Sequence, residues 1–337
     1  MPEYQIIIKD GSDNIIGELR NFTSLVFSKI MNNFGSCKFA IPVTNPDLSS
    51  FIGLRRFETH IFRDGTLIWA GEQALIENSL KADSPNLLKV TSFGWFEQLF
   101  GRLTSEKYDG IDAGEIAWDA IDTSQNETDG DIGITEGTIE ATQNRDRNYS
   151  DDNIAVEIQR LTSVINGFDM EITDSKVFNV YEFQGLDKSN QIVFEYGTNI
   201  EEVSKLVQDF SIITNQTVVR GEGMGTEQAR VTRTDTDARS IYGLRQRLIT
   251  ESNISETTSL NEKGDAINNK RKQPVLEIAF KQEAGTLPTF GSISMGDLVQ
   301  VKIQHGIHNI NNQFRVFGWE VSFDSKGKET IEYFLGL

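Results

Sequence analysis

Residues 55–94 read "RRFETHIFRDGTLIWAGEQALIENSLKADSPNLLKVTSFG" and carry the strongest local signal for the fold. Two β-rich runs, 57–62 and 66–69, flank an Asp-Gly pair at residues 64 and 65. Such a pair favours a tight hairpin, because both central turn residues need a positive φ. The second run continues toward residue 80, and another strand is expected over 87–93. The stretch therefore predicts three successive strands in an antiparallel meander.

Residues 295–336 return to the same order of strands, turns and a Gly beside a Trp, here Gly318-Trp319. Strands are expected over 298–304, 313–317, 321–323 and 329–334. Few letters match, so the likeness lies in element order and hairpin spacing. Two interpretations stay open: an internal duplication, or the ordinary appearance of an antiparallel meander, because strands of about five or six residues with short turns are the norm.

The composition limits the classes of protein that the chain can belong to. Its 337 residues predict two to four domains of roughly 100 residues each. The net charge of −18 repels nucleic acid and anionic membranes, so sequence-specific DNA binding is not expected. No run approaches the roughly 18 apolar residues of a membrane helix, and the N-terminus lacks a basic region. We therefore expect a soluble protein that is made inside the cell.

The N-terminal region reads as one β domain. Short β-rich runs are expected as strands over 4–9, 15–20, 26–30 and 37–43. After the meander, the segment "GWFEQLFGR" predicts a short helix with one apolar face. We place the end of this domain near Arg102.

Helical periodicity begins after residue 102 and indicates an α/β unit. Asp112 followed by Glu115 predicts a capping box for a helix over 113–123. A second helix carries Ile154, Ile158, Leu161 and Ile165 on its inner face. For that helix we expect Ser150 or Asp151 at the N-cap and Gly167 at the C-terminus. A strand pair is expected over 168–173 and 177–183.

The remaining chain is expected to return to β structure around one interruption. A strand is expected over 211–220, and a helix over about 259–270 followed by Pro274. The run "VLEIAF" after this proline has the alternation of a strand. The Gly-rich stretch at 221–225 follows no βαβ frame and contains no Lys, so it does not predict a phosphate site.

Catalytic motifs are absent from the sequence. It contains no P-loop, GxSxG, HExxH or CxxC pattern. The only histidines are His60, His305 and His308, and no Cys or carboxylate stands at helpful spacing to make a metal site with them. Cys37 is the only cysteine and suits a buried strand position. A pair of carboxylates of the glycosidase type stays open, because that geometry is three-dimensional.

Several stretches together resemble the baseplate hub or tail-tip hub proteins of tailed bacteriophages. They are "HIFRDGTLIWAGE", "LKVTSFGWFEQLFGR", "DAGEIAWDAIDTSQ", "VEIQRLTSVINGFDMEI", "FEYGTNIEEV", "TNQTVVRGEG", "IYGLRQRLITESNI", "SISMGDLVQVKI" and "QFRVFGWEVSFDSKGKETIEYFL". None is an active-site motif, and together they span nearly the full chain.

The resemblance implies a mainly β (α+β) fold with two tube-like antiparallel β-barrel domains. It implies a first barrel at 1–102, an α/β domain at 103–190, a second barrel from 191–238 and 285–337, and an insertion domain at 239–284. Three copies with two related barrels each would give six similar positions around an axis. A trimer could then stack on a six-fold tail tube.

The function implied by the resemblance is a structural hub of the tail tip or baseplate, located in the virion and made in the host cytoplasm. The implied partners are two further copies, the distal tail ring, the tape measure protein and other tail-tip or fibre proteins, with DNA passing through without specific binding. We expect no catalytic residue, cofactor or metal. Candidate residues for the barrel core or assembly contacts are Ile61, Ile68, Trp69, Val316 and Trp319.

Two other functions stay open. One is a hydrolase that cuts cell wall or polysaccharide with two carboxylates during host entry. The other is a monomeric carbohydrate-binding adaptor. Native mass separates these from the hub, since a three-fold state is not expected of either.

Overall fold

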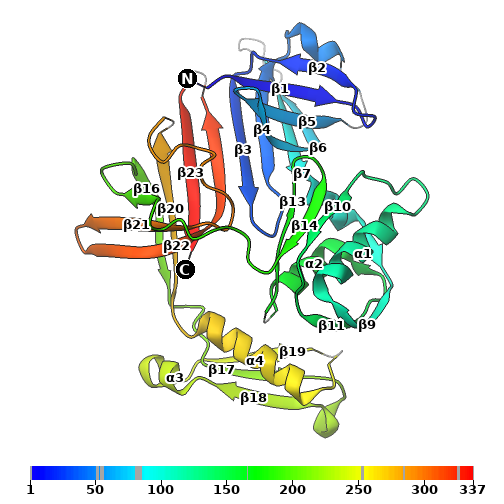
Figure 1. Cartoon of the computed structure of the whole chain (residues 1–337), viewed down its shortest axis with the longest axis vertical. Helices are drawn as coiled ribbons and strands as arrows, with labels where there is room; N and C mark the ends of the chain where they lie inside the picture. The colour runs from blue at the N-terminus through cyan, green and yellow to red at the C-terminus, as the bar shows by residue number, and fades with distance from the viewer. Residues whose placement is uncertain are drawn as a thin grey trace.

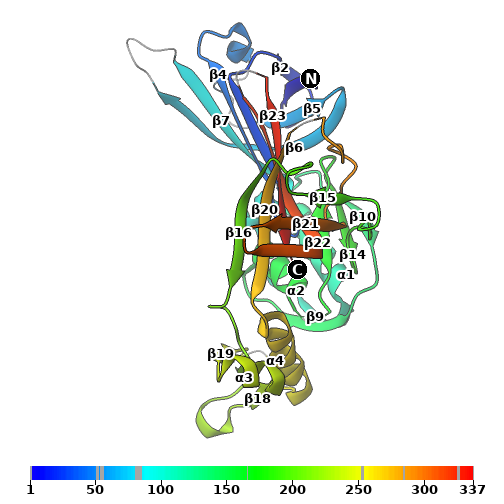
Figure 2. The same ribbon diagram turned by 90° about the vertical axis from the view of Figure 1, so that its left-hand side faces the viewer.

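A computed structural model describes residues 2–50, 53, 57–79, 86–164, 166–251, 254–283, 285–324 and 327–336. Strands contain 48% of the residues and helices 18%, so the expected mainly β fold is confirmed. Within the described residues, thirteen strands form one twisted sheet. An α/β unit lies beside the lower part of this sheet, and a second small unit hangs from its lower end (Figure 1, Figure 2).

The first seven strands form an antiparallel module, which we call the first module. Its strands are β1 (Tyr4–Lys9), β2 (Ile15–Leu19), β3 (Ser24–Ile30), β4 (Ser36–Pro42), β5 (Glu58–Arg63), β6 (Thr66–Ser79) and β7 (Leu87–Gly94), with the 3-10 helices η1 (Pro46–Ser50) and η2 (Trp95–Gly101). Their order is β3-β4-β7-β6-β5-β1-β2. The predicted meander is thus β5-β6-β7, and the predicted short helix is η2.

The hairpin between β5 and β6 has the predicted tight turn. Arg63 pairs with Thr66, so Asp64 and Gly65 alone make the loop. Their φ angles are 50° and 78°, both in the left-handed region that a type I′ turn requires. The Asp-Gly signal is therefore confirmed.

The second module contains β15 (Val193–Glu195), β16 (Glu202–Asp209), β20 (Val275–Glu283), β21 (Leu298–His305), β22 (His308–Phe323) and β23 (Glu329–Gly336). Its strands lie in the order β16-β20-β23-β22-β21, which repeats β3-β4-β7-β6-β5 of the first module. All eight pairs along these two paths are antiparallel. The repeat suspected from the sequence is confirmed at the level of strand order.

Matching bulges align the two long middle strands, β6 and β22. The pairing of β6 with β7 shifts at Ala74, and that of β22 with β23 shifts at Phe317. These bulges make Ile76, two residues past the first bulge, the counterpart of Trp319. The Gly-Trp likeness seen in the sequence is therefore not a structural equivalence, although the element order is.

The two modules are continuous because β3 of the first pairs with β22 of the second, antiparallel from Leu25↔Phe323 to Ile30↔Gly318. One hydrophobic core runs through both modules. In the described part of the chain the strand path is open, from β16 to β2. Closure of the modules into tubes therefore stays a proposal.

The α/β unit has a core of its own. It comprises β8 (Leu103–Thr104), β9 (Lys107–Asp112), α1 (Ala113–Gln125), β10 (Thr135–Ile139), β11 (Asn144–Asn148), β12 (Asp152–Asn153), α2 (Ile154–Thr162), β13 (Asp169–Ile172) and β14 (Val177–Tyr181). The helix predicted over 113–123 is α1, and Asp112 caps it by accepting from the Gly114 amide.

The expected ends of α2 were wrong. Residues 152 and 153 pair with β8, so the helix begins later than expected, and Asn153 caps it by accepting from the Val156 amide. The helix ends at Thr162 with Ser163 as its C-cap, well before Gly167. Ile165, which was expected on the inner face, lies outside the described residues.

The inserted unit lies between Asp209 and Val275, whereas an insertion was expected at 239–284. Its elements are β17 (Gln216–Arg220), η3 (Gly225–Glu227), β18 (Arg230–Thr234), α3 (Thr236–Tyr242), β19 (Gln246–Thr250) and α4 (Thr257–Arg271). The strands form their own sheet in the order β18-β17-β19. The β-rich run at 216–220 pairs locally, whereas β20 lies between β16 and β23 of the large sheet. The other domain boundaries stay predictions.

Candidate assembly surface

The five candidate residues named from the sequence lie at the core of the large sheet. Ile61, Trp69, Val316 and Trp319 are buried, and Ile68 is partly buried against the same core. The structure thus brings them into one cluster that spans both modules. Whether they also act in assembly stays a prediction.

Two tryptophans from different modules both contact β3, the strand at the junction. The indole Nε1 of Trp69 donates to the backbone oxygen of Ser28 at 3.0 Å. The Trp319 ring meets Phe27 edge to face, with the centroids 5.8 Å apart. Buried aromatic groups contribute a large apolar area, and the buried indole N–H has its partner. These contacts stabilise the junction between the modules.

A buried ion pair also joins the modules. Arg63 at the end of β5 donates to both carboxylate oxygens of Glu329 in β23, each at 3.2 Å. The hydroxyl of Tyr4 donates to the same carboxylate at 3.1 Å. Burial and the neighbouring charge of Glu329 raise the pKa of the Tyr4 phenol, which therefore stays protonated and remains a donor. Bidentate pairing satisfies a carboxylate that is almost fully buried.

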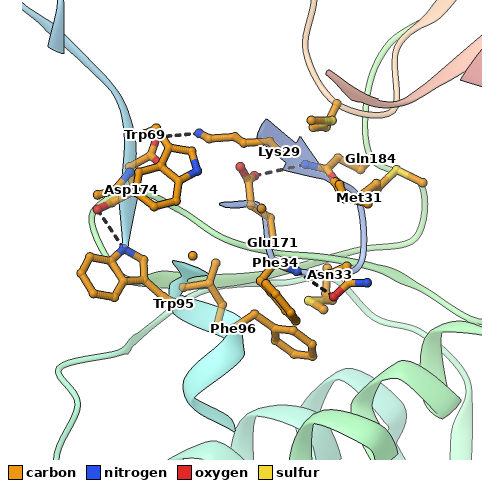
Figure 3. Close-up of a pocket in the computed structure, with 17 residues that line it drawn as sticks. Lys29, Met31, Asn33, Phe34, Trp69, Trp95, Phe96, Glu171, Asp174 and Gln184 are labelled. Atoms are coloured by element: carbon orange, nitrogen blue, oxygen red, sulfur yellow. Dashed lines mark hydrogen bonds and ion pairs between the residues drawn. The ribbon is translucent and has the colours of Figure 1, made fainter. Parts of the chain in front are cut away.

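The turn between β13 and β14 attaches the α/β unit to the first module (Figure 3). The carboxylate of Asp174 in this turn accepts from the Lys29 ammonium and from the Ala70 amide, at 2.5 and 3.1 Å. Its backbone oxygen accepts from the Trp95 indole at 3.2 Å. One short turn thus contacts β3, β6 and η2 together.

Lys176, two residues after Asp174 in the same turn, makes a second contact between the α/β unit and the first module. Its ammonium lies 2.6 Å from the Glu58 carboxylate and 4.3 Å from the centre of the Trp95 ring. Burial opposes ionisation of Glu58, but hydrogen bonds from His60 and Lys176 outweigh it, so the net pKa of Glu58 is lowered. Glu58 is therefore charged at neutral pH and holds Lys176 in place.

Asp169 connects the α/β unit to both modules. Its carboxylate pairs with Arg315 of β22, and it accepts from the side-chain amide of Asn32 in the β3–β4 turn at 3.1 Å. The Asn32 side-chain oxygen in turn accepts from the Met170 amide at 2.7 Å. Such reciprocal hydrogen bonds hold the turn and the strand in a defined position.

A cavity of about 50 Å³ lies within this interface. Its walls include Lys29, Trp69, Trp95, Glu171 and Asp174 (Figure 3). Sites for small molecules are usually about 300–1,000 Å³, so this one has room for little more than water. Burial raises the pKa of Glu171, against the opposing effect of the Lys29 charge. The geometry is that of a joint between units.

His305, His308 and Cys37 were considered for chemistry from the sequence. Among the described residues, no three His, Cys, Asp or Glu side chains are placed to hold a metal ion. His305 and His308 face each other across the exposed end of the β21–β22 hairpin. Cys37 is fully buried, and burial raises the pKa of its thiol, which disfavours the nucleophilic thiolate. No helix in the described residues is both long and apolar enough to cross a membrane.

Two strand edges were missed by the sequence analysis. Beyond its bulge, β6 pairs with β7 on one side, and β16 pairs with β20 on one side; no partner occupies the other side of either among the described residues. Whether an edge is free depends on the pairing of the whole sheet, so local composition gives no signal for it. The repeated meander was the one sequence feature that pointed toward these edges.

No protein-family model matches the sequence, and no curated protein is detectably similar to it. Solved structures do match. The 43 kDa tail protein of prophage MuSo2 from Shewanella oneidensis aligns with a TM-score of 0.70 and 11% identity, over 98% of this chain and 98% of that chain. The chain has the fold of phage tail proteins. The resemblance drawn from the sequence is thus confirmed at the level of the fold.

Two further structures share this tail-protein fold. The tail protein from Neisseria meningitidis MC58 aligns with a TM-score of 0.69 and 14% identity, over 99% of this chain and 96% of that chain. A chain of the lidless PdpA–VgrG complex aligns with a TM-score of 0.58 and 11% identity, over 100% of this chain and 65% of that chain.

Proposed function

We propose that this chain is a structural hub of a phage tail tip or baseplate. In this proposal three copies form a ring of six modules that continues or closes the tail tube and forms part of the conduit for DNA ejection. The observation that carries it is the repeated module, joined edge to edge within one chain by β3 and β22. The tail-protein fold supports the same conclusion.

Joining two like modules in one chain suits a change from three-fold to six-fold symmetry. Each chain offers two copies of one strand arrangement. Head-to-tail contacts between identical subunits form a ring when the rotation from one subunit to the next closes. The partners on either side would be the distal tail ring, the tape measure protein and other tail-tip or fibre proteins. The match to a chain of a PdpA–VgrG complex supports partners among tail proteins.

The proposed role is assembly, without a chemical step. The ion pairs described above, Arg63 with Glu329, Lys29 with Asp174 and Arg315 with Asp169, each join two modules or units, which suits a joint. The proposed location is therefore the tail tip of the virion.

Native mass measured over a wide concentration range tests the proposal. A hub is expected to reach three times the 37.9 kDa of one chain, and averaged electron-microscope images should show a ring with a central opening. A monomer at every concentration, alone and with a tail ring, would overturn the proposal.

A further inference from the structure

The contact between neighbouring copies can be derived from the contact within one copy. Inside the chain, β22 has β23 on one side, while β21 and then β3 follow each other along its opposite side. In the first module β6 has β7 on one side and β5 along the first part of the other. The place that β3 takes beside β22 is therefore the free edge of β6 past Ala74, in the described part of the chain.

The strand that fits this edge is the counterpart of β3 in the second module, which is β16. Both are the outermost strand of the repeated order, and both are antiparallel to the next strand, β4 or β20. β3 uses its second edge to pair with β22. Among the described residues, the second edge of β16 has no partner.

The register follows from pairs that are already present. Phe27 corresponds to Leu206, because each lies opposite a residue, Cys37 or Ile278, that pairs in turn with equivalent positions of β7 and β23. Val321 pairs with Phe27 and lies four residues past the bulge at Phe317. The residue four past the bulge at Ala74 is Asn78, so Asn78 belongs opposite Leu206.

We propose that β6 of one copy pairs antiparallel with β16 of a second copy. This pairing rests on the ring proposed above. The pairs would be Leu75↔Asp209, Ile76↔Gln208, Glu77↔Val207, Asn78↔Leu206 and Ser79↔Lys205. One further backbone bond has a counterpart, since the Met31 amide donates to the bulge oxygen of Phe317 at 2.9 Å. The same bond between copies would join the Phe210 amide to the oxygen of Ala74.

The burial of the side chains supports this register. Ile76 and Leu206 both pack partly against the hydrophobic core, and the proposed pairs place them on one face of the joined sheet. A slip of one residue would put them on opposite faces, because successive side chains of a strand alternate. On the outer face, Leu75 and Val207 are 49% and 38% exposed and would become diagonal neighbours.

A second copy is the occupant that fits, because each chain carries both edges. The edge of β6 can receive a strand, and β16 can supply one. Their junction would repeat the junction of β3 with β22 inside one chain. Unpaired strand edges are templates for adding a strand, so the edges of β6 and β16 favour pairing with each other.

Paired cysteines test the register. The variant Glu77→Cys with Val207→Cys should form a disulfide between copies under mild oxidation and give a covalent trimer on a denaturing gel. The matched positive control is Glu320→Cys with Ser28→Cys, the same pair at the internal junction, which should close within one chain. Cys37 is buried and leaves the background low.

A misaligned pair, Glu77→Cys with Lys205→Cys, is the negative control. It should cross-link about tenfold less, because an offset of two residues moves the Cα atoms apart by about 7 Å, beyond disulfide reach. A native trimer in which the misaligned pair links as well as the proposed one, or neither links, overturns the register but leaves the hub. A monomer without links overturns both.

Discussion

The hairpin turn at Asp64-Gly65 can be tested with a natural pair of glycines. Gly65 has a φ of 78°, whereas Gly11 in the β1–β2 hairpin has no left-handed φ; a methyl group at either would meet nothing within 4 Å. Gly65→Ala is therefore expected to lower the free energy of unfolding by about 1–2 kcal/mol through backbone strain alone. Gly11→Ala should cause no loss. Equal effects in urea denaturation would contradict this explanation.

Trp69 is expected to be the most sensitive of the candidate residues. Trp69→Ala leaves a large cavity and should cost about 3–5 kcal/mol. Trp69→Phe keeps most of the apolar contact but leaves the Ser28 carbonyl without its donor, which costs about 1–3 kcal/mol. The matched control is Ile307→Ala at the hairpin tip, where the side chain is 95% exposed and a change within about 0.5 kcal/mol is expected. If the tryptophan variants unfold at the same urea concentration as the control, the assignment fails.

Glu171 should make stability depend on pH in a direction opposite to most carboxylates. Burial raises its pKa, so its favourable protonated form is fully present below the ordinary value of 4.5 and is lost as pH rises through the higher folded-state pKa. Glu171→Gln, which keeps an oxygen for the Gln184 amide, is therefore expected to raise Tm at neutral pH. The gain should disappear at acidic pH below 4.5.

The control for this change is Glu136→Gln on the exposed face of β10 in the same unit. It should leave the Tm difference flat across the same pH range. A gain for Glu171→Gln that is independent of pH would point to a packing effect instead.

Among the elements, the inserted unit is expected to be dispensable for folding of the large sheet. It occupies the position of the β3–β4 turn and has its own buried residues, including Val219 and Leu260. Replacing residues 210–274 with the three residues 31–33 should leave β16 and β20 paired, and the shortened chain should unfold cooperatively. Removing β20 as well should abolish folding, because that strand lies between β16 and β23. Circular dichroism during heating measures both.

Local signals in the sequence predicted the elements better than their pairing. The Asp-Gly turn and the cap of α1 depend on neighbouring residues, so they were readable. The strand at 216–220 was assigned to the wrong sheet, because its composition suits either a local or a distant partner. Residues 152 and 153 delay the start of α2 by pairing with β8 across nearly fifty residues of chain, a contact that no helix pattern records.

The candidate site shows the same division. Ile61, Trp69, Val316 and Trp319 were candidates for the barrel core or for assembly contacts, and the structure buries all four. The turn that carries Asp174 and Lys176 was missed, because polar turn residues look alike until their distant partners are known. The free edges of β6 and β16 are properties of the completed sheet.

For the whole molecule, the charge of −18 predicts that DNA passes without binding. Attraction to phosphates supplies the affinity of nonspecific DNA binding, and here the overall field is repulsive. Fluorescence anisotropy with labelled duplex DNA should therefore show no association, even at low salt. Affinity that falls steeply as salt rises would reveal a basic surface and contradict the prediction.

Matching turns of the two modules carry the two additional units. Asn32 in the β3–β4 turn binds the α/β unit, and the inserted unit begins after Asp209, at the end of β16. Both additions therefore project from the same end of the molecule, and the opposite end carries sheet strands and loops (Figure 1, Figure 2). A ring of such subunits would carry the α/β unit and the inserted unit on one rim only. The rim without these units could stack on a similar ring, whereas the rim with them could not, so stacking would stop after a single layer. The stack would then have a direction and a defined end, and both would follow from the shape of each subunit.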